Sequence, residues 1–136
     1  MKKNKNSETL KEMEEIYYPN MQIGDSKYLD WMGFEINYEN KPSYHHIVKY
    51  SHQKSEKLAE KTTIENGAYL GEYSHIALHQ IEKVDIYLYN RWNNLFREII
   101  KLGKYPTEDI WEKIFELQIE SISLFDNVED TKKRGK

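Results

Sequence analysis

The chain of 136 residues contains no cysteine. Disulfides, thiolate zinc sites, iron–sulfur clusters and a cysteine nucleophile are therefore excluded, and any metal ion must be held by histidine and oxygen ligands. Long apolar runs are also missing, and no apolar stretch follows the basic first residues, so we expect neither a membrane span nor a signal peptide and place the chain in the cytoplasm. Hydrophobic residues make up 38% of the sequence, which is enough for the modest core of a single domain.

The chain also lacks a large net charge of either sign, since its formal net charge is only −3. Residues 1–106 are balanced, whereas residues 107–131 hold eight acidic residues and one lysine, a net charge of −7. A domain that binds nucleic acid over its whole surface would be basic, so the composition allows only a local basic footprint. Residues 41–61 supply such a footprint, with Lys41, Lys49, Lys54, Lys57 and Lys61.

The first half of the chain reads as one helix and two strands. Apolar residues at helical spacing predict a helix over Ser7–Tyr18 that ends before Pro19. Segment Trp31–Ile36 could be a strand or a buried loop. Residues typical of strands at Tyr44–Tyr50 and Gly67–Tyr73 predict a hairpin whose long loop is polar and rich in lysine.

The second half is helical. Ser74 is the expected N-cap of a helix that runs to Gly103, either as one helix or as two with a break near Val84 and Asp85. Thr107 is the expected N-cap of a last helix with a broad apolar face and an acidic first turn.

All five histidines lie between residues 45 and 79. His45 and His46 are adjacent on the first predicted strand, so their side chains point to opposite sides of it. His75 and His79 are four residues apart on the next predicted helix, so they share a face and can converge on one ion. Asn66 opens the second predicted strand, and eight residues separate it from His75.

The order of these residues resembles that of the H-N-H endonucleases. In that family a hairpin carries the histidine pair on its first strand and packs on a helix that supplies the last ligands, which is called a ββα-metal finger. The matching segments here are YHHIV at 44–48, TIENGA at 63–68 and YSHIALH at 73–79. Their final spacing is most similar to that of the colicin-type DNases, and as a set they resemble small H-N-H proteins of bacteria and phages. The resemblance covers about residues 44–83.

The resemblance implies a role for each of these residues. His45, His75 and His79 would be metal ligands, His46 the general base, and Asn66 would hold the loop and orient the base. An imidazole suits the deprotonation of a water near pH 7, and a cation would stabilise charge on the phosphoryl oxygens and the leaving 3′-oxygen. Three imidazoles favour Zn, Ni, Co or Mn over Mg, although Mg could act if phosphate oxygens and water complete its shell.

These patterns together predict an α+β domain over residues 1–125. A ββα-metal finger at 44–83 is expected to be flanked by an N-terminal helix and by a helical extension at 84–125, with a disordered charged tail at 126–136.

The function expected first is a metal-dependent H-N-H endonuclease that hydrolyses DNA phosphodiester bonds. Its expected contacts with DNA are Lys49, Lys54, Lys57 and Lys61. One alternative is a non-catalytic H-N-H-fold regulator from a phage or mobile element, which binds another protein through the acidic last helix. Another is a domain whose histidines hold a structural metal.

Overall fold

The structure is a computed structural model, and it describes residues 5–23, 28–48 and 62–134. Its elements follow in the order α1 (Lys5–Tyr17), β1 (Pro42–His46), the short 3₁₀ helix η2 (Ile64–Asn66), β2 (Gly67–Gly71), α3 (Glu72–Val84), α4 (Ile86–Leu102) and α5 (Glu108–Arg134). The two strands and the helices on either side of them confirm the predicted α+β fold class. None of the helices in these described ranges is long and apolar enough to cross a membrane.

The hairpin formed by β1 and β2 carries the histidine pair. Its strands are antiparallel, with His45 opposite Ala68 and His46 opposite Gly67. Each strand has five residues and is shorter than predicted. Gly67 is needed here, because a Cβ at this position would overlap the ring of Tyr44 on the partner strand.

Helix α3 follows β2 without a loop and completes a ββα arrangement. It begins at Glu72, with Gly71 in the N-cap position, so the prediction of Ser74 as N-cap is wrong. The reason is that the strand turns directly into the helix, which leaves Ser74 buried in the first turn beside the carboxyl group of Asp30.

The long helical region divides at Asp85 into two helices, the second of the two alternatives that the sequence left open. The Asp85 carboxylate accepts hydrogen bonds from the backbone N–H groups of Tyr87 and Leu88 (3.1 Å each) and so caps α4. Helix α4 ends at Gly103, whose φ of 71° lies in the left-handed region that favours glycine.

Helix α5 runs through Arg134, past the position where a disordered tail is expected. Residues 126–134 contain no glycine or proline that would end a helix, and the first such residue is Gly135. The helix also passes close to the loop before β1, where a Cβ on Gly33 (φ 89°) would overlap the side chain of Gln118.

Residues 28–40 form a partly buried loop, in which Asp30, Trp31, Met32 and Ile36 are buried. This corresponds to the loop alternative considered for Trp31–Ile36. Leu29 and Glu35 make an isolated β-bridge. The fully buried carboxylate of Asp30 holds the turn, because it accepts hydrogen bonds of 2.8–3.0 Å from the backbone N–H groups of Met32, Phe34 and Gly71. The loop is thereby tied to the junction of β2 and α3.

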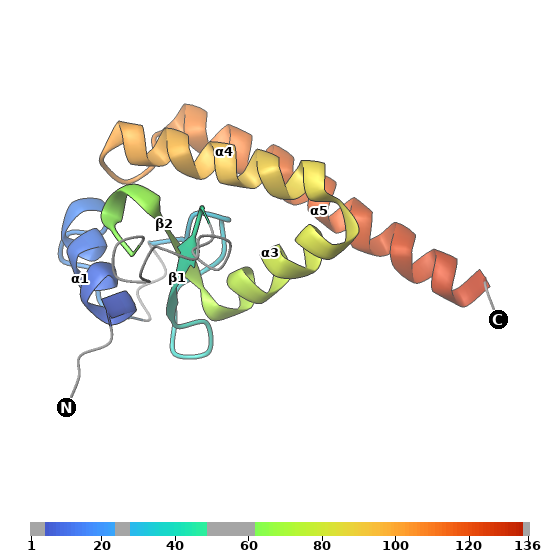
Figure 1. The fold of residues 1–136 in the computed structure, drawn as a ribbon, viewed down its shortest axis with the longest axis horizontal. Coiled ribbons are helices and arrows are strands. Elements are labelled where there is room, and N and C mark those ends of the chain that lie inside the picture. Colours follow the sequence, from blue (N-terminus) through green and yellow to red (C-terminus); the bar gives the residue numbers. More distant parts are fainter. Residues whose placement is uncertain (1–4, 24–27, 49–61, 135–136) are drawn as a thin grey trace, which may run out of the picture.

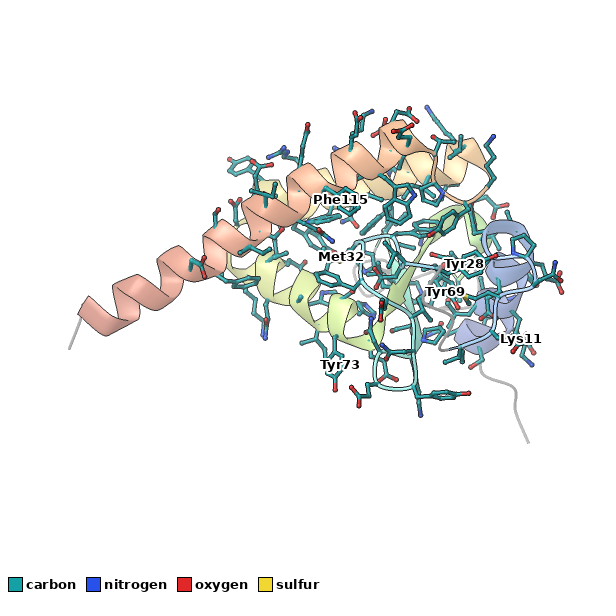
Figure 2. The ribbon with its side chains drawn as sticks, turned by 180° about the vertical axis from the view of Figure 1, so that it is seen from behind. Lys11, Tyr28, Met32, Tyr69, Tyr73 and Phe115 are labelled. Carbon is teal, nitrogen blue, oxygen red and sulfur yellow. The ribbon has the colours of Figure 1, made fainter. Side chains whose placement is uncertain are left out.

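The core lies between the hairpin, α1 and α4, and its largest fully buried side chains include Trp31, Trp92, Tyr18, Tyr69 and Phe96. Figure 1 shows the hairpin between α1 and α3, with α4 passing over them. Seen from behind in Figure 2, α5 lies along α4 and continues beyond its end. This arrangement gives the hairpin a face covered by α3 and α4, and His45 points into it.

Candidate metal centre

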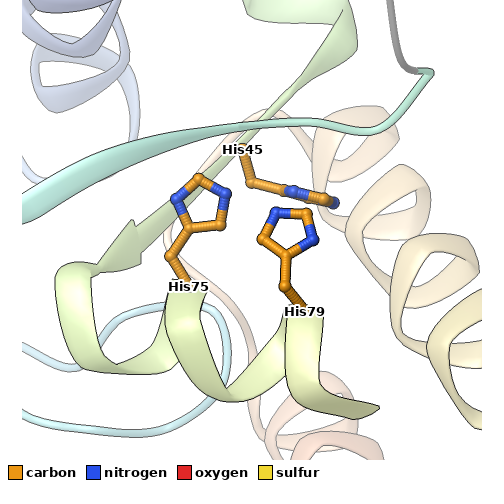
Figure 3. Close-up of side chains that lie close together, drawn as sticks. All are labelled: His45, His75 and His79. Atoms are coloured by element: carbon orange, nitrogen blue, oxygen red, sulfur yellow. The ribbon is translucent and has the colours of Figure 1, made fainter. Parts of the chain in front are cut away.

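Three histidines from two elements converge beneath α4. His45 comes from β1, while His75 and His79 lie one turn apart on α3. The ring centroids are 5.3 Å apart for His45 and His75, 5.6 Å for His45 and His79, and 4.8 Å for His75 and His79. One nitrogen of each ring lies within 4.8 Å of the corresponding nitrogens, and Figure 3 shows the rings turned toward one another. The structure thus brings together the three predicted metal ligands.

Each of these imidazoles also has a polar partner at one of its nitrogens. His45 Nε2 lies 2.8 Å from Asn93 Oδ1, and His75 Nδ1 lies 2.7 Å from Ser43 Oγ. His79 Nδ1 lies 3.0 Å from the carboxylate oxygen Oε1 of Glu82. Histidines that bind metals commonly donate their other ring N–H to such an oxygen, which fixes the tautomer and the ring orientation.

Burial keeps two of the rings neutral. It lowers the pKa of His45 to about 3, with a smaller opposing effect from the hydrogen bond to Asn93. It also lowers the pKa of His75 to about 4, and the neighbouring His79 and His46 act in the same direction. At neutral pH both imidazoles are therefore uncharged, which is the form that binds a metal ion.

The donor set fits a divalent transition metal. Ligand nitrogens at about 2.0–2.1 Å from a tetrahedral ion are roughly 3.4 Å apart. The nitrogens of the three rings lie within 4.8 Å of one another, so they must approach by up to about 1.4 Å to bind one ion. Rotation of the side chains supplies a movement of this size. Neutral imidazoles suit Zn, Ni, Co and Mn, whereas Mg would need oxygen ligands from outside this cluster.

His46 lies on the opposite side of β1 from this cluster. Its Nε2 is 2.9 Å from the hydroxyl of Thr62, and its ring packs edge-on against Tyr44 at a centroid distance of 4.7 Å. Partial burial lowers its pKa, so this imidazole is also neutral at neutral pH and can accept a proton. The predicted base therefore lies across β1 from the predicted ligands, near enough that its charge acts on the rings of His45 and His75.

Asn66 holds the chain that follows β1. Its Oδ1 accepts a hydrogen bond from Val48 N–H (2.9 Å), and its Nδ2 donates to the Val48 carbonyl (3.1 Å). The Asn66 carbonyl accepts from Ile47 N–H (2.9 Å). These contacts fix the backbone directly after His46, at the point where the loop that Asn66 is predicted to hold begins.

An open pocket of about 500 Å³ lies beside the histidines. The described residues that line it are Ser43, Glu72, His75, Ile76, His79, Gln80 and Lys83, and Lys83 is the one cation among them. The predicted DNA contacts Lys49, Lys54, Lys57 and Lys61 lie outside the described residues.

The acidic residues in the first half of α5 lie outside the lining of this pocket. Glu120 pairs with Arg91 of α4 (2.7 Å), and Lys113 of α5 pairs with Glu98 (2.8 Å). None of Glu108, Glu112, Glu116 and Glu120 is among the residues that line the pocket. A polyanion at the histidines would therefore not meet these carboxylates directly.

Sequence reasoning missed Asn93, Glu82 and Ser43. Two of these had a signal in the sequence: Asn93 interrupts the apolar face of α4, and Glu82 stands three residues after His79 on the same helix. No sequence signal pointed to Ser43, because its contact with His75 depends on how β1 packs on α3.

We compared the chain with protein-family models, with curated proteins and with solved structures, and found no match in any of them.

Proposed function

We propose that the protein is a metal-dependent endonuclease of the H-N-H type that hydrolyses DNA phosphodiester bonds in the cytoplasm. The observation that supports this most is the convergence of His45, His75 and His79 from a ββα unit, each with an oxygen partner on its other side. The order of these histidines with His46 and Asn66 supports the same proposal, since it resembles the H-N-H pattern.

In this proposal the chain's own residues orient the reaction and move its proton. His46 accepts a proton from a water whose oxygen attacks phosphorus, and the bond to the 3′-oxygen breaks as the new P–O bond forms. A bound divalent ion would supply positive charge for the phosphoryl oxygens and the leaving oxygen. Asn66 keeps His46 in place through its paired hydrogen bonds to the backbone of Val48.

The position of His46 supports contact with a strand of DNA at this face. Val48 and Thr62 flank the lysine-rich segment 49–61, and both lie close to His46. Val48 follows His46 by two residues, and the Thr62 hydroxyl is within hydrogen-bond distance of the His46 ring. The described residues on either side of this segment therefore lie beside His46. We propose that its lysines bind the phosphates on either side of the scissile bond.

The test is cleavage of supercoiled plasmid by metal-free protein to which Zn, Ni, Co, Mn or Mg is added singly. The proposal expects nicking with at least one of these ions, its loss with EDTA, and its loss in His75→Ala. His52→Ala is the matched control, because it removes the one histidine outside the proposed site and should keep full activity. No nicking with any ion, or equal nicking by His75→Ala, would contradict the proposal.

A second candidate is a protein of the same fold that binds metal without cleaving DNA and acts on a basic protein partner through α5. The observation that favours it is the hydrogen bond between His46 and Thr62, which occupies one of the two ring nitrogens of the proposed base. The same assay separates the two candidates, because this one predicts metal binding without nicking.

A further inference from the structure

Asn93 is a polar residue on the buried face of α4, where it is 3% exposed. Its neighbours on that face are apolar or aromatic: Leu88, Tyr89, Trp92, Leu95, Phe96 and Ile99. A buried amide without a hydrogen bond destabilises the folded state, so such a residue needs a partner. The partner is His45, itself 1% exposed, at 2.8 Å between Nε2 and Oδ1.

The chemistry of this contact fixes where the proton of His45 lies. A carbonyl oxygen accepts hydrogen bonds and cannot donate them, so Nε2 must carry the hydrogen. A neutral imidazole has only one such hydrogen, which leaves Nδ1 of His45 with a free lone pair.

We propose that Asn93 is a positioning residue of the metal centre, which makes Nδ1 of His45 the atom that binds the ion. The inference rests on the metal site of the proposed function. It extends that site beyond the ββα unit, because Asn93 belongs to α4 and lies 48 residues from its partner in sequence.

The two helical ligands should use the other nitrogen. Nδ1 of His79 donates to the carboxylate of Glu82, which leaves its Nε2 for the ion. Nδ1 of His75 is occupied by the Ser43 hydroxyl, a group that can accept or donate, so Nε2 is again the nitrogen left for the ion. The centre would then be asymmetric, with Nδ1 from the strand and Nε2 from both helical residues. This pattern distinguishes the inference from one in which Asn93 merely fills space.

Nuclear magnetic resonance of ¹⁵N-histidine-labelled protein tests the inference directly. In the metal-free wild type, His45 should be the Nε2–H tautomer. After addition of ¹¹³Cd, the metal should couple to Nδ1 of His45 and to Nε2 of His75 and His79. An Nδ1–H tautomer in the metal-free protein, or coupling to Nε2 of His45, would overturn the inference.

Variants of Asn93 add a second readout. Asn93→Leu keeps the volume but removes the acceptor, so metal affinity should fall by about 10- to 100-fold and the tautomer of His45 should become mixed. Asn93→Asp retains an acceptor and should keep both the affinity and the Nε2–H tautomer. Asn94→Leu is the matched control, since the same change at the next, exposed position should alter neither.

The outcomes separate this inference from the proposed function. If ¹¹³Cd couples to none of the three histidines, the metal site fails, while the tautomer in the metal-free protein still decides the role of Asn93. If Asn93→Leu does not fold, the wild-type tautomer and the coupling pattern still decide it. Unchanged affinity and tautomer in a folded Asn93→Leu protein would contradict the inference.

Discussion

The two faces of β1 carry neighbouring histidines in contrasting surroundings. On one face His45 is 1% exposed and is covered by α3 and α4, with two further imidazoles and the Asn93 amide around it. On the other face His46 is only partly buried, next to Thr62 and the backbone that Asn66 holds. A ligand group benefits from a dry site that keeps it neutral, whereas a base needs access to water and substrate. The alternation of a strand provides both environments within two residues.

The largest expected effect comes from the face of β1 that carries His46. His46→Ala should reduce plasmid cleavage by about 100-fold or more, because one catalytic group is lost, while the ligand cluster remains intact. The metal-induced rise in melting temperature should stay as in the wild type. Nicking rates and thermal unfolding with and without metal measure the two quantities. An active His46→Ala protein would remove the proposed mechanism and leave only the metal site.

Substitutions on the covered face of β1 and on α3 should instead abolish the stabilisation by metal that His46→Ala retains. Metal at 100 times its Kd stabilises a folded protein by about 2.7 kcal/mol if the unfolded chain does not bind it. His45→Ala and His75→Ala should each erase this stabilisation and its rise in melting temperature. His52→Ala should retain it. A rise that persists in both ligand variants would place the metal elsewhere on the chain.

The same contrast predicts how stability depends on pH without metal. Burial lowers the pKa of His45 to about 3 and of His75 to about 4, whereas the unfolded chain titrates near about 6.5. Below that value the unfolded state binds more protons, so the free energy of unfolding should fall as the pH falls from about 6.5 toward about 4. Above about 7 these two groups should contribute no slope.

Urea unfolding between about pH 7.5 and about pH 5 measures this slope in a range where most carboxyl groups remain ionised. His45→Gln should reduce the slope without abolishing it, because the variant lacks one of the two titrating rings. A wild-type midpoint that does not change over this range would show that the rings are not buried as described.

A smaller effect is expected at Asn66. Asn66→Ala removes two hydrogen bonds to the backbone of Val48 and should lower the free energy of unfolding by about 1–2 kcal/mol. Cleavage should fall more than stability, since the removed bonds fix the chain next to His46. Metal affinity should stay unchanged, and an equal loss of metal affinity would contradict the separation of the two faces.

The smallest expected effect of a single substitution is on DNA binding. If Lys49, Lys54 and Lys57 contact phosphates, each replacement by alanine should reduce the slope of log affinity against log salt by roughly one unit. Lys101→Ala on the exposed side of α4 is the control and should leave the slope unchanged. DNA affinity measured over a series of salt concentrations checks this. Absence of binding at low salt with metal present would favour the protein-binding alternative.

The sequence predicted those parts of the fold that depend on local patterns. Apolar spacing located α1, and the break at Asp85 follows from a residue that caps the helix after it. The position of α3 was predicted less well. A serine is a common cap, but β2 turns into the helix at Gly71, so Ser74 became an interior residue beside Asp30. A direct strand-to-helix junction leaves no loop residue whose type could reveal it.

The candidate site divides in the same way. Convergence of His75 and His79 follows from helical spacing, and the opposite directions of His45 and His46 follow from the strand. The partners Asn93 and Ser43 could not be assigned to their histidines, because those contacts form only when α4 and α3 pack on the hairpin. Local periodicity carries no information about such packing.

The central claim is that the covered face of β1 and one face of α3 share a single metal ion. Its most direct test is a crystal of the protein with one equivalent of zinc, measured at the zinc absorption edge. The account predicts one anomalous peak within roughly 2.0–2.1 Å of a nitrogen of each of His45, His75 and His79. A peak bound to His46, or no peak among the three rings, would contradict it.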